Sequence, residues 1–141
     1  MKVDRATGLI ADTIRAHNAQ HRVCIGAFSQ KRLRLFRKLR PDVPTSFSPL
    51  AVAALRLGFR PGGGEVFQIP RTHSFFGLPI TLATPRRINA IHDYGRKVHV
   101  WTIDDPVAMH ELIDWGVDGI ITDRPDLLKG VLRNRGMWSA Q

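Results

Sequence analysis

The amino-acid sequence predicts an α/β fold made of parallel strands that alternate with helices. Short runs of β-branched and aromatic residues recur along the chain, and a longer segment with helical periodicity follows most of them. Three of these segments run from a proline to a glycine, at residues 49–58, 85–95 and 106–116, with Ser, Thr or Asp directly before the proline. Because proline favours the first position of a helix and glycine the position after its end, these three helices have defined limits.

The first part of the chain is expected to hold two complete strands. Residues 2–3 are predicted to be the last residues of a strand whose earlier part is not in the sequence. A helix capped by Asp4 or Thr7 is predicted to follow. Residues 22–28 (RVCIGAF) are predicted to form a buried strand, and residues 43–46 a short one.

The second part repeats the alternation more clearly. Residues 65–69 (EVFQI) are predicted to form a strand, and residues 71–79 an irregular loop. Residues 97–101 (KVHVW) and 119–121 (GII) form the next strands, and each ends in polar residues. A final helix follows from Asp123. Ligands of α/β folds bind at such strand ends, so we expect any functional site there.

The net charge of +9 is high for 141 residues. Its densest run is KRLRLFRKLR at residues 31–40, which Ser29 is placed to cap. Leu33 and Phe36 lie three residues apart, so the run predicts an amphipathic helix with a basic outer side. No nucleic-acid reading motif accompanies the charge, so we expect no specific nucleic-acid partner.

The cysteine content and the amino-terminal sequence bear on location. Cys24 is the one cysteine, so no disulfide can form within the chain, and a reducing compartment fits best. The first residues have neither the apolar core of a signal peptide nor a membrane-spanning stretch. We therefore expect a cytoplasmic protein without a membrane span.

Two architectures fit this alternation. One is an open, doubly wound sheet, and the other is part of a (β/α)₈ barrel, which needs about 250 residues when complete. The strand end at residues 2–3 favours the barrel fragment. The absence of a glycine-rich phosphate loop after residues 22–28 also favours it, because an open nucleotide-binding fold places one there.

The sequence VHVWTIDDPVAMHELIDWGVDGIITDRPDLL (residues 98–128) resembles the C-terminal end of the glycerophosphodiester phosphodiesterases, which are TIM-barrel enzymes. FQIP (residues 67–70) resembles the sixth strand of that family, and residues 22–41 resemble its fourth strand and the helix after it. The resemblance thus implies strands 4–8 of a TIM barrel, with the end of strand 3. Residues 1–141 would form a partial domain that lacks the N-terminal catalytic half.

The resemblance implies hydrolysis of glycerophosphodiesters to glycerol 3-phosphate and an alcohol. The family uses a divalent cation, calcium or magnesium, held by carboxylates, and two histidines as general acid and base. The family's His-Arg-Gly and Glu-Asn-Thr patterns are absent from this sequence, and its one His-Asp pair, His92–Asp93, falls within a predicted helix and is not interpreted as the family's later His-Asp pair. We therefore expect no metal bound by this chain alone and no phosphodiesterase activity from it.

The start of the chain is part of the same comparison. Lys2 matches a lysine that contacts phosphate in the family, two residues after a metal-binding acid. Met1 stands where the family has an apolar residue. We expect upstream in-frame codons for that acid and for His-Arg-Gly; stop codons directly upstream would instead indicate a truncated gene.

The resemblance implies a substrate pocket that includes Trp101. The role of Trp101 can be either a wall of the substrate pocket or core packing. Gln68 and Phe28 likewise either line the pocket or pack in the barrel. His99 lies on the same strand face as Trp101 but deeper, so we interpret it as a hydrogen-bonded core histidine.

The other polar candidates have structural interpretations. Asp104, Asp105 and Asp123 each lie just before a helix and are interpreted as N-caps rather than metal ligands. His73 is the one histidine in a predicted mouth-facing loop. The remaining candidates are predicted to have surface, packing or capping roles: His17, His21, His92, His110, Ser29 and Cys24.

A non-catalytic module is the alternative function. A partial barrel leaves two strand edges unpaired, and such edges recruit partners. The chain would then form homo-oligomers or pair with a separately encoded N-terminal half.

Overall fold

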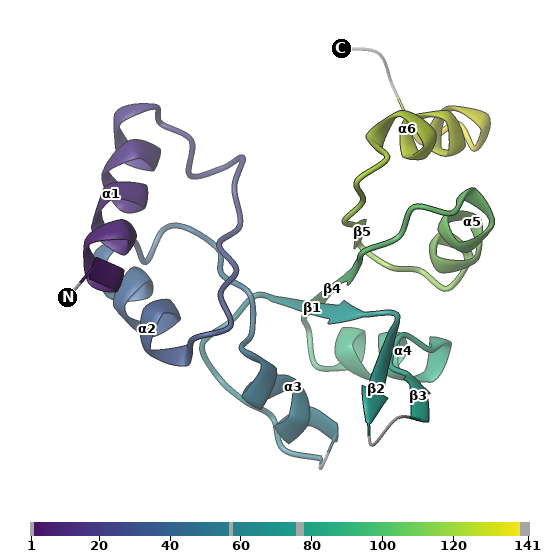
Figure 1. Ribbon diagram of the computed structural model, residues 1–141, viewed down its shortest axis with the longest axis horizontal. Helices are drawn as coiled ribbons and strands as arrows, with labels where there is room; N and C mark the ends of the chain where they lie inside the picture. Colours follow the sequence, from purple (N-terminus) through teal and green to yellow (C-terminus); the bar gives the residue numbers. More distant parts are fainter. Residues whose placement is uncertain (1, 57, 76–77, 139–141) are drawn as a thin grey trace. The chain divides into compact units, whose positions relative to one another are not determined.

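The computed structural model describes residues 2–56, 58–75 and 78–138, and the chain divides into two compact units, residues 1–67 and 68–141 (Figure 1). Each unit is described by itself. Within the described residues, no helix is long and apolar enough to cross a membrane.

The first unit contains three helices and short parallel bridges. The helices are α1 (Lys2–Ala16), α2 (Gln30–Leu39) and α3 (Pro49–Arg56). Isolated parallel bridges join Ile25 to Thr45 and Ser46 to Val66. The core lies between α1, α2 and the chain that follows each of them, and its buried members are Ala11, Ile14, Phe36 and Val43.

Two predictions for this unit are wrong. Residues 2–3 are helical and not strand, so neither Asp4 nor Thr7 is the N-cap of α1. Thr7, Ala11 and Ile14 are all buried, and their spacing of four and three residues places them on one face of a helix.

Residues 22–28 also differ from the prediction. Instead of a buried strand, the segment makes one bridge, at Ile25, and Phe28 is 81% exposed. The N–H of Ile25 donates to the Pro44 carbonyl at 3.0 Å, and the Ile25 carbonyl accepts from Ser46 N–H at 2.8 Å. An apolar run becomes a full strand only when neighbours pair with it, and among the described residues this segment is paired on one side alone.

The amphipathic basic helix is confirmed as α2. Ser29 is its N-cap and accepts from the Arg32 N–H at 3.4 Å. Leu33 and Phe36 are buried. Arg37 reaches from the helix to the bridge segment, where it donates to Thr45 Oγ1 at 2.7 Å and to the Ser46 carbonyl at 2.9 Å.

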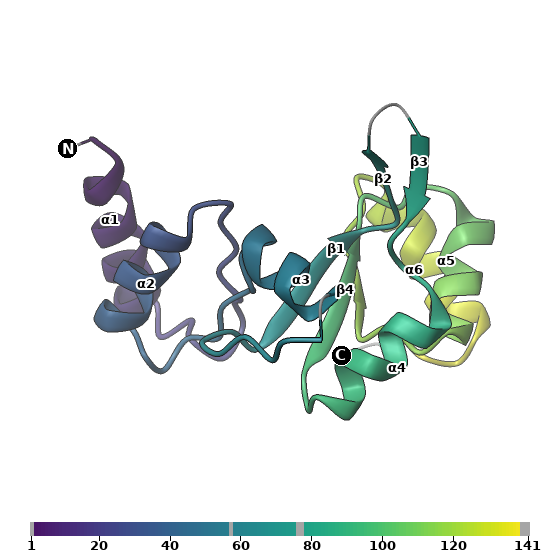
Figure 2. The ribbon, with the colours of Figure 1, turned by 90° about the horizontal axis from the view of Figure 1, so that it is seen from below.

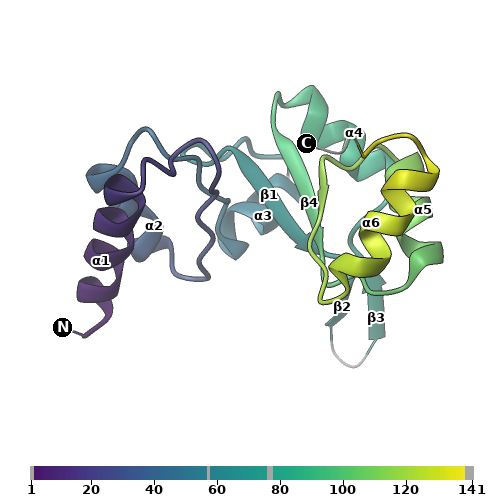
Figure 3. The ribbon, with the colours of Figure 1, turned by 90° about the horizontal axis from the view of Figure 1, so that it is seen from above.

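The second unit is built on a three-stranded sheet with strand order β1-β4-β5, and Figure 2 shows β1 and β4 side by side. The strands are β1 (Val66–Pro70), β4 (Lys97–Trp101) and β5 (Gly119–Ile120), and β4 and β5 are parallel with His99 opposite Gly119. The helices α4 (Pro85–Asp93), α5 (Pro106–Asp114) and α6 (Pro125–Asn134) alternate with them (Figure 3). These parallel strand–helix units confirm the predicted α/β class.

One face of this sheet is buried and the other is partly open. Val98 and Val100 of β4 are fully buried, as are Ile88 and Ile91 of α4 and Met109 and Leu112 of α5. The alternate residues, His99 and Trp101, are half-buried. Because side chains alternate along a strand, the apolar face carries the helices and the opposite face carries the histidine and the tryptophan.

The proline and glycine signals have the predicted effect. Thr84 and Asp105 are the N-caps of α4 and α5, each followed by a proline in the first turn. Gly95 and Gly116 have positive φ values of 70° and 81°, which glycine adopts without steric cost.

Residues 71–79, predicted as an irregular loop, mostly form strand. The strands β2 (Thr72–Phe75) and β3 (Leu78–Thr81) pair antiparallel, with Thr72 opposite Thr81. This pair of strands is hard to predict from the sequence, because position 79 is a proline and apolar and polar residues do not alternate clearly.

Candidate functional site

The carboxyl ends of the three strands in the second unit meet at one edge of the sheet. The Arg71 N–H, directly after β1, donates to the Trp101 carbonyl at the end of β4 at 3.3 Å. Beyond β5, Ile121 N–H donates to the Val100 carbonyl at 2.9 Å, and Ile103 N–H donates to the Ile121 carbonyl at 3.0 Å. These bonds fix the strand ends side by side and define the candidate site.

Trp101 and Gln68 both belong to this unit and are half-buried, on β4 and β1 respectively. Neither side chain is enclosed in the core, which is the placement that a pocket wall requires. Their role as pocket residues stays a prediction. Phe28, the third predicted pocket residue, belongs to the first unit, where it is exposed.

His99 packs on the strand beside it. A Cβ on Gly119 would lie 2.7 Å from Cδ2 of His99, so the imidazole ring rests directly on the glycine backbone. Burial and the nearby Lys97 lower the pKa of His99, although the Asp118 carboxylate opposes this shift. The ring makes no hydrogen bond within the described part of the chain, so the predicted hydrogen bond is not found. A neutral packing histidine results.

The acidic residues after β4 have unlike roles. Asp105 accepts from Val107 N–H at 3.3 Å and from Ala108 N–H at 3.1 Å, which confirms it as the N-cap of α5. Asp104 is not a cap. One of its carboxylate oxygens accepts from Thr122 Oγ1 and from Asp123 N–H, both at 2.8 Å, and so ties the loop after β4 to the loop after β5.

The N-cap interpretation of Asp123 is also wrong. The N-cap of α6 is Arg124, whose side chain makes no capping bond. The Thr122 hydroxyl accepts from Arg124 N–H at 2.9 Å, and the Arg124 guanidinium pairs with Asp126 at 2.7 and 3.0 Å. The sequence predicts a cap at Asp123 because this residue lies near the start of α6. Its backbone N–H instead donates to Asp104, and this bond joins the two strand-end loops.

Two residues of this unit that the sequence did not single out organise its strand ends. Arg71 forms an ion pair with Glu111 of α5, and its carbonyl accepts from Leu82 and Ala83. At the opposite end of β4, Asp118 accepts from Val98 N–H at 2.8 Å and pairs with His92 Nε2 at 2.9 Å. Asp118 does have a signal in the sequence: it is an acidic residue between Gly116, which ends a helix, and the strand that follows.

The pKa of Asp118 reflects these contacts. Burial by itself raises it, but the Val98 N–H and the His92 ring together outweigh burial and hold it below its ordinary value. Asp118 is therefore a structural carboxylate that joins α4 to β4 and β5.

The other histidines have structural positions where they are described. His92 pairs with Asp118, and Nδ1 of His110 lies 3.1 Å from the Arg135 guanidinium at the end of α6. His17 and His21 are exposed in the first unit. The side chains of His73 and Lys2 lie outside the described part of the chain, as does Met1.

Cys24, in the first unit, is half-buried. Burial and the Glu65 carboxylate raise the pKa of its thiol, which suppresses the thiolate. The sequence predicts a packing role for Cys24, and the structure has it partly rather than fully buried.

The described residues do not fit a divalent cation. Within them, no group of three or more His, Cys, Asp or Glu side chains is placed to hold a metal ion. Three carboxylates near the strand ends are engaged: Asp104 and Asp105 accept backbone N–H groups, and Glu111 pairs with Arg71. The edge carries the half-buried Trp101 and two loops that Asp104 joins, and its described residues include no group of three or more metal-ligating side chains.

Comparison with known proteins gives a consistent result. The sequence profile of the glycerophosphoryl diester phosphodiesterase family matches residues 1–127. A relative in Mycobacterium tuberculosis, a probable glycerophosphodiester phosphodiesterase 2, is 43% identical over 129 residues, which cover 86% of this chain and 48% of the relative.

Solved structures share the fold. A putative glycerophosphoryl diester phosphodiesterase from Silicibacter pomeroyi matches with a TM-score of 0.72 at 22% identity, over 96% of this chain and 46% of its own. A phosphodiesterase from Oleispira antarctica, solved in complex with the product sn-glycerol-3-phosphate, matches with a TM-score of 0.66 at 15% identity, over 93% and 50%. The fold is therefore part of a TIM barrel, and the chain spans about half the length of these proteins.

Proposed function

The chain belongs to the glycerophosphoryl diester phosphodiesterase family, and from this we propose that it forms the strand 4–8 part of an enzyme that hydrolyses glycerophosphodiesters to glycerol 3-phosphate and an alcohol. The observation that carries the proposal is the match of the family profile over residues 1–127. The single cysteine, Cys24, supports a cytoplasmic location for that enzyme.

In this proposal the chain binds and orients the substrate without breaking the bond. Trp101 and Gln68 form part of the pocket wall, and Lys2 contacts the phosphate. A divalent cation, calcium or magnesium, would neutralise charge on the phosphoryl oxygens in the complete enzyme. Among the described residues no group of three or more His, Cys, Asp or Glu side chains could hold it, and Asp104, Asp105 and Glu111 have backbone or arginine partners, which supports a metal site outside these residues.

The isolated chain is therefore proposed to be inactive. The test is hydrolysis of glycerophosphocholine, with calcium or magnesium, by three proteins: the chain alone, the M. tuberculosis relative, and a chimera. The chimera joins this chain to the part of the relative that it does not cover. We expect turnover by the relative and the chimera and none by the chain. Turnover by the chain alone would contradict its proposed inactivity, and a folded but inactive chimera would contradict its proposed place in the enzyme.

The role of Trp101 is tested in the same chimera. Trp101→Ala is expected to lower kcat/KM by about tenfold or more, because a wall contact to the substrate is lost. Trp138→Ala is the matched control, since Trp138 is 45% exposed and lies beyond α6, against Lys129. Equal effects of the two substitutions would show that Trp101 has no special contact with the substrate.

A second function, a non-catalytic module that recruits another chain, is favoured by one observation. The backbone groups of Cys24 and Gly26 have no hydrogen-bond partner among the described residues, although Ile25 between them is paired. Sedimentation of the purified chain, alone and with a separately produced N-terminal half, measures self-association and complementation. A monomer under both conditions would remove this function.

A further inference from the structure

Arg71 joins several segments at the strand-end edge of the second unit. Its N–H donates to the Trp101 carbonyl, at the end of β4, at 3.3 Å. Its carbonyl accepts from the N–H groups of Leu82, at 2.8 Å, and Ala83, at 3.2 Å, directly after the hairpin β2–β3. Its guanidinium forms an ion pair with Glu111 of α5. One residue thus connects the end of β1 to the end of β4, to the base of the hairpin and to α5.

The ion pair is the side-chain part of this junction. The hydrogen bond from Arg71 to Trp101 is 3.3 Å long, beyond the usual N···O distance of about 2.7–3.2 Å, so by itself it holds the end of β4 weakly. The side chains of Arg71 and Glu111 are 33% and 41% exposed, so solvent screens the pair only in part. Because a bond between two charged groups is stronger than a neutral one, we expect the side chain of Arg71 to fix the place of its own backbone.

Trp101 is the residue whose place depends on this junction. It is the last residue of β4, it is half-buried, and it forms part of the pocket wall in the proposed enzyme. A side chain that binds a substrate must stay within about 0.5 Å of its productive place, and the residues behind it hold it there. Arg71 bonds to the backbone of Trp101 and directs its guanidinium to α5, so its effect on a substrate would pass through Trp101.

We propose that Arg71, through its ion pair with Glu111, is a positioning residue for Trp101 in the substrate pocket. The pair holds the end of β1 beside the end of β4, and this keeps the indole where it contacts a bound glycerophosphodiester. The proposal rests on the proposed function, because it requires Trp101 to be part of the pocket wall. It adds a residue that acts on substrate binding without touching the substrate.

A matched ion pair lies away from this edge. Arg135, at the end of α6, pairs with Asp114 in the last turn of the same helix α5, and its side chain is 27% exposed, close to the 33% of Arg71. Because α5 begins just after the carboxyl end of β4, its last turn lies toward the opposite end of the sheet. Arg135→Ala therefore removes a similar ion pair from α5 and leaves the junction at Arg71 unchanged.

Kinetics of the chimera described above test the proposal. Arg71→Ala and Glu111→Ala are each expected to raise KM for glycerophosphocholine by about three- to tenfold with kcat within about twofold, because substrate binding weakens while the bond-breaking groups are unchanged. Arg71→Lys keeps a positive charge for Glu111 and should recover most of the loss. Arg135→Ala should leave KM within about twofold. Equal increases in KM from Arg71→Ala and Arg135→Ala would overturn the proposal.

A double-mutant cycle determines whether Arg71 acts through Trp101. In the Trp101→Ala chimera the indole is already absent, so the addition of Arg71→Ala should change kcat/KM by less than about twofold. If Arg71 only stabilised the fold, its replacement would lower kcat/KM by the same factor with and without the indole. That result would overturn the proposal.

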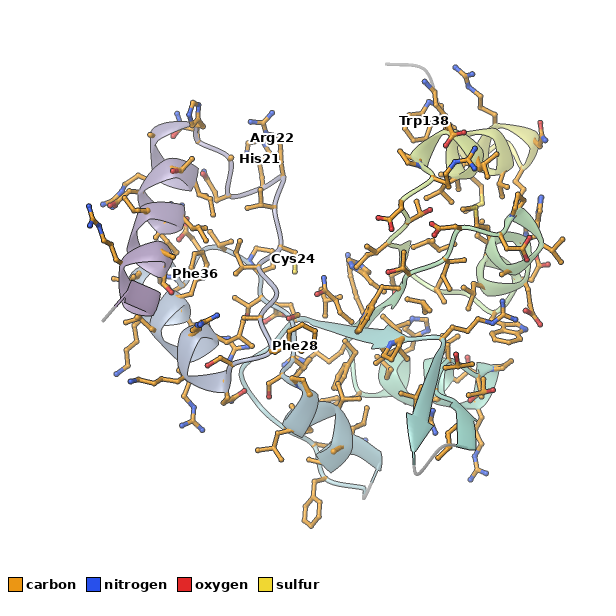
Figure 4. The ribbon with its side chains drawn as sticks, in the orientation of Figure 1. His21, Arg22, Cys24, Phe28, Phe36 and Trp138 are labelled. Atoms are coloured by element: carbon orange, nitrogen blue, oxygen red, sulfur yellow. The ribbon has the colours of Figure 1, made fainter. Side chains whose placement is uncertain are left out.

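NMR of the tryptophan indole groups in the full ¹⁵N-labelled chain tests the same point without enzymatic activity. Trp138 lies beside α6 in Figure 4, against Lys129, and its signal serves as the internal reference. Arg71→Ala should shift or broaden the indole signal of Trp101 and leave that of Trp138 in place, whereas Arg135→Ala should leave the Trp101 signal in place. An unchanged Trp101 signal in Arg71→Ala would overturn the proposal. An inactive parent chimera would contradict the proposed function alone, and the indole signal would still decide whether Arg71 positions Trp101.

Discussion

The contact between His99 and Gly119 shows how a single residue constrains the sheet. The two residues are paired across β4 and β5, and the imidazole ring occupies the space that a Cβ at position 119 would need. The ring also stays largely neutral because burial lowers its pKa. Two predictions follow from this one contact, one steric and one electrostatic.

Gly119→Ala is expected to destabilise the protein by about 1–3 kcal/mol, since the new methyl group forces the ring or the strand to move. Urea unfolding followed by circular dichroism measures the change. Gly130→Ala is the matched control: Gly130 lies within α6, and a Cβ there meets nothing within 4 Å. Because alanine favours helix, this control should be neutral or stabilising by up to about 1 kcal/mol. Equal losses would show that His99 does not fill that space.

His99 is expected to make stability depend on pH. Its folded pKa lies below the unfolded value of 6.5, so the unfolded state binds more protons as the pH falls below that value. The contribution is complete above pH 6.5 and is lost as the pH falls toward the folded pKa. Unfolding free energies measured from pH 8 downward should therefore fall less steeply in His99→Gln than in the parent chain. Parallel curves would mean that the histidine is not held neutral.

The loops after β4 and β5 act at the scale of elements. Asp104 joins the two loops, whereas Asp105 caps α5 through two backbone N–H groups. Neighbouring aspartates thus stabilise different parts of the same strand-end edge. Because Asp104 and Asp105 have different hydrogen-bond partners, the cap that Asp105 provides can be tested by itself.

Asp105→Ala should destabilise the protein by about 0.5–2 kcal/mol, because α5 loses its N-cap. Asp105→Asn retains a side-chain oxygen and should restore most of the loss. Asp123→Ala is the control, since the backbone of Asp123 donates a bond but no side-chain cap at α6 involves it. Thermal unfolding of the three variants measures the effect. A larger loss from Asp123→Ala than from Asp105→Ala would contradict the assigned roles.

Local signals explain which elements could be predicted from the sequence. Thr84, Pro85 and Gly95 place α4, and Asp105, Pro106 and Gly116 place α5, because a cap, a proline and a glycine act through the nearby backbone alone. The same holds for Ser29 at α2.

The remaining differences between the prediction and the structure depend on partners that are distant in the sequence. Residues 22–28 have strand-like composition, but whether they form a strand depends on neighbours that the local sequence does not specify. Asp104 lies before a helix in sequence, yet its bond to Thr122 comes from a segment eighteen residues away. The hairpin β2–β3 likewise arises from pairing, with His73 opposite Ile80. In the candidate site, Trp101 could be predicted from the sequence pattern and the resemblance, whereas Arg71 is recognised only from its contacts.

At the scale of the whole molecule, the charge is distributed unevenly. Almost all of the net charge of +9 lies in the first unit, where the twelve basic residues of positions 1–67 exceed the acids by eight. Like charges that are close together repel and reduce the stability of a compact state. Lys31, Arg34 and Lys38 on the exposed side of α2 are without ion-pair partners among the described residues, so this repulsion is not locally compensated.

Salt is therefore expected to stabilise the first unit more than the second. Raising NaCl shortens the screening distance, which is about 10 Å at 0.1 M and about 3 Å at 1 M, and so weakens repulsion among the cations of α1 and α2. Amide hydrogen exchange read by mass spectrometry reports each helix separately. Protection in α2 should rise with salt, while protection in α5, whose unit is nearly neutral, should change little. In Lys31→Gln/Lys38→Gln, α2 should be more protected at low salt and respond less to added NaCl. An equal response of α2 and α5 in the parent chain would show that screening of the first unit's charge is not the cause.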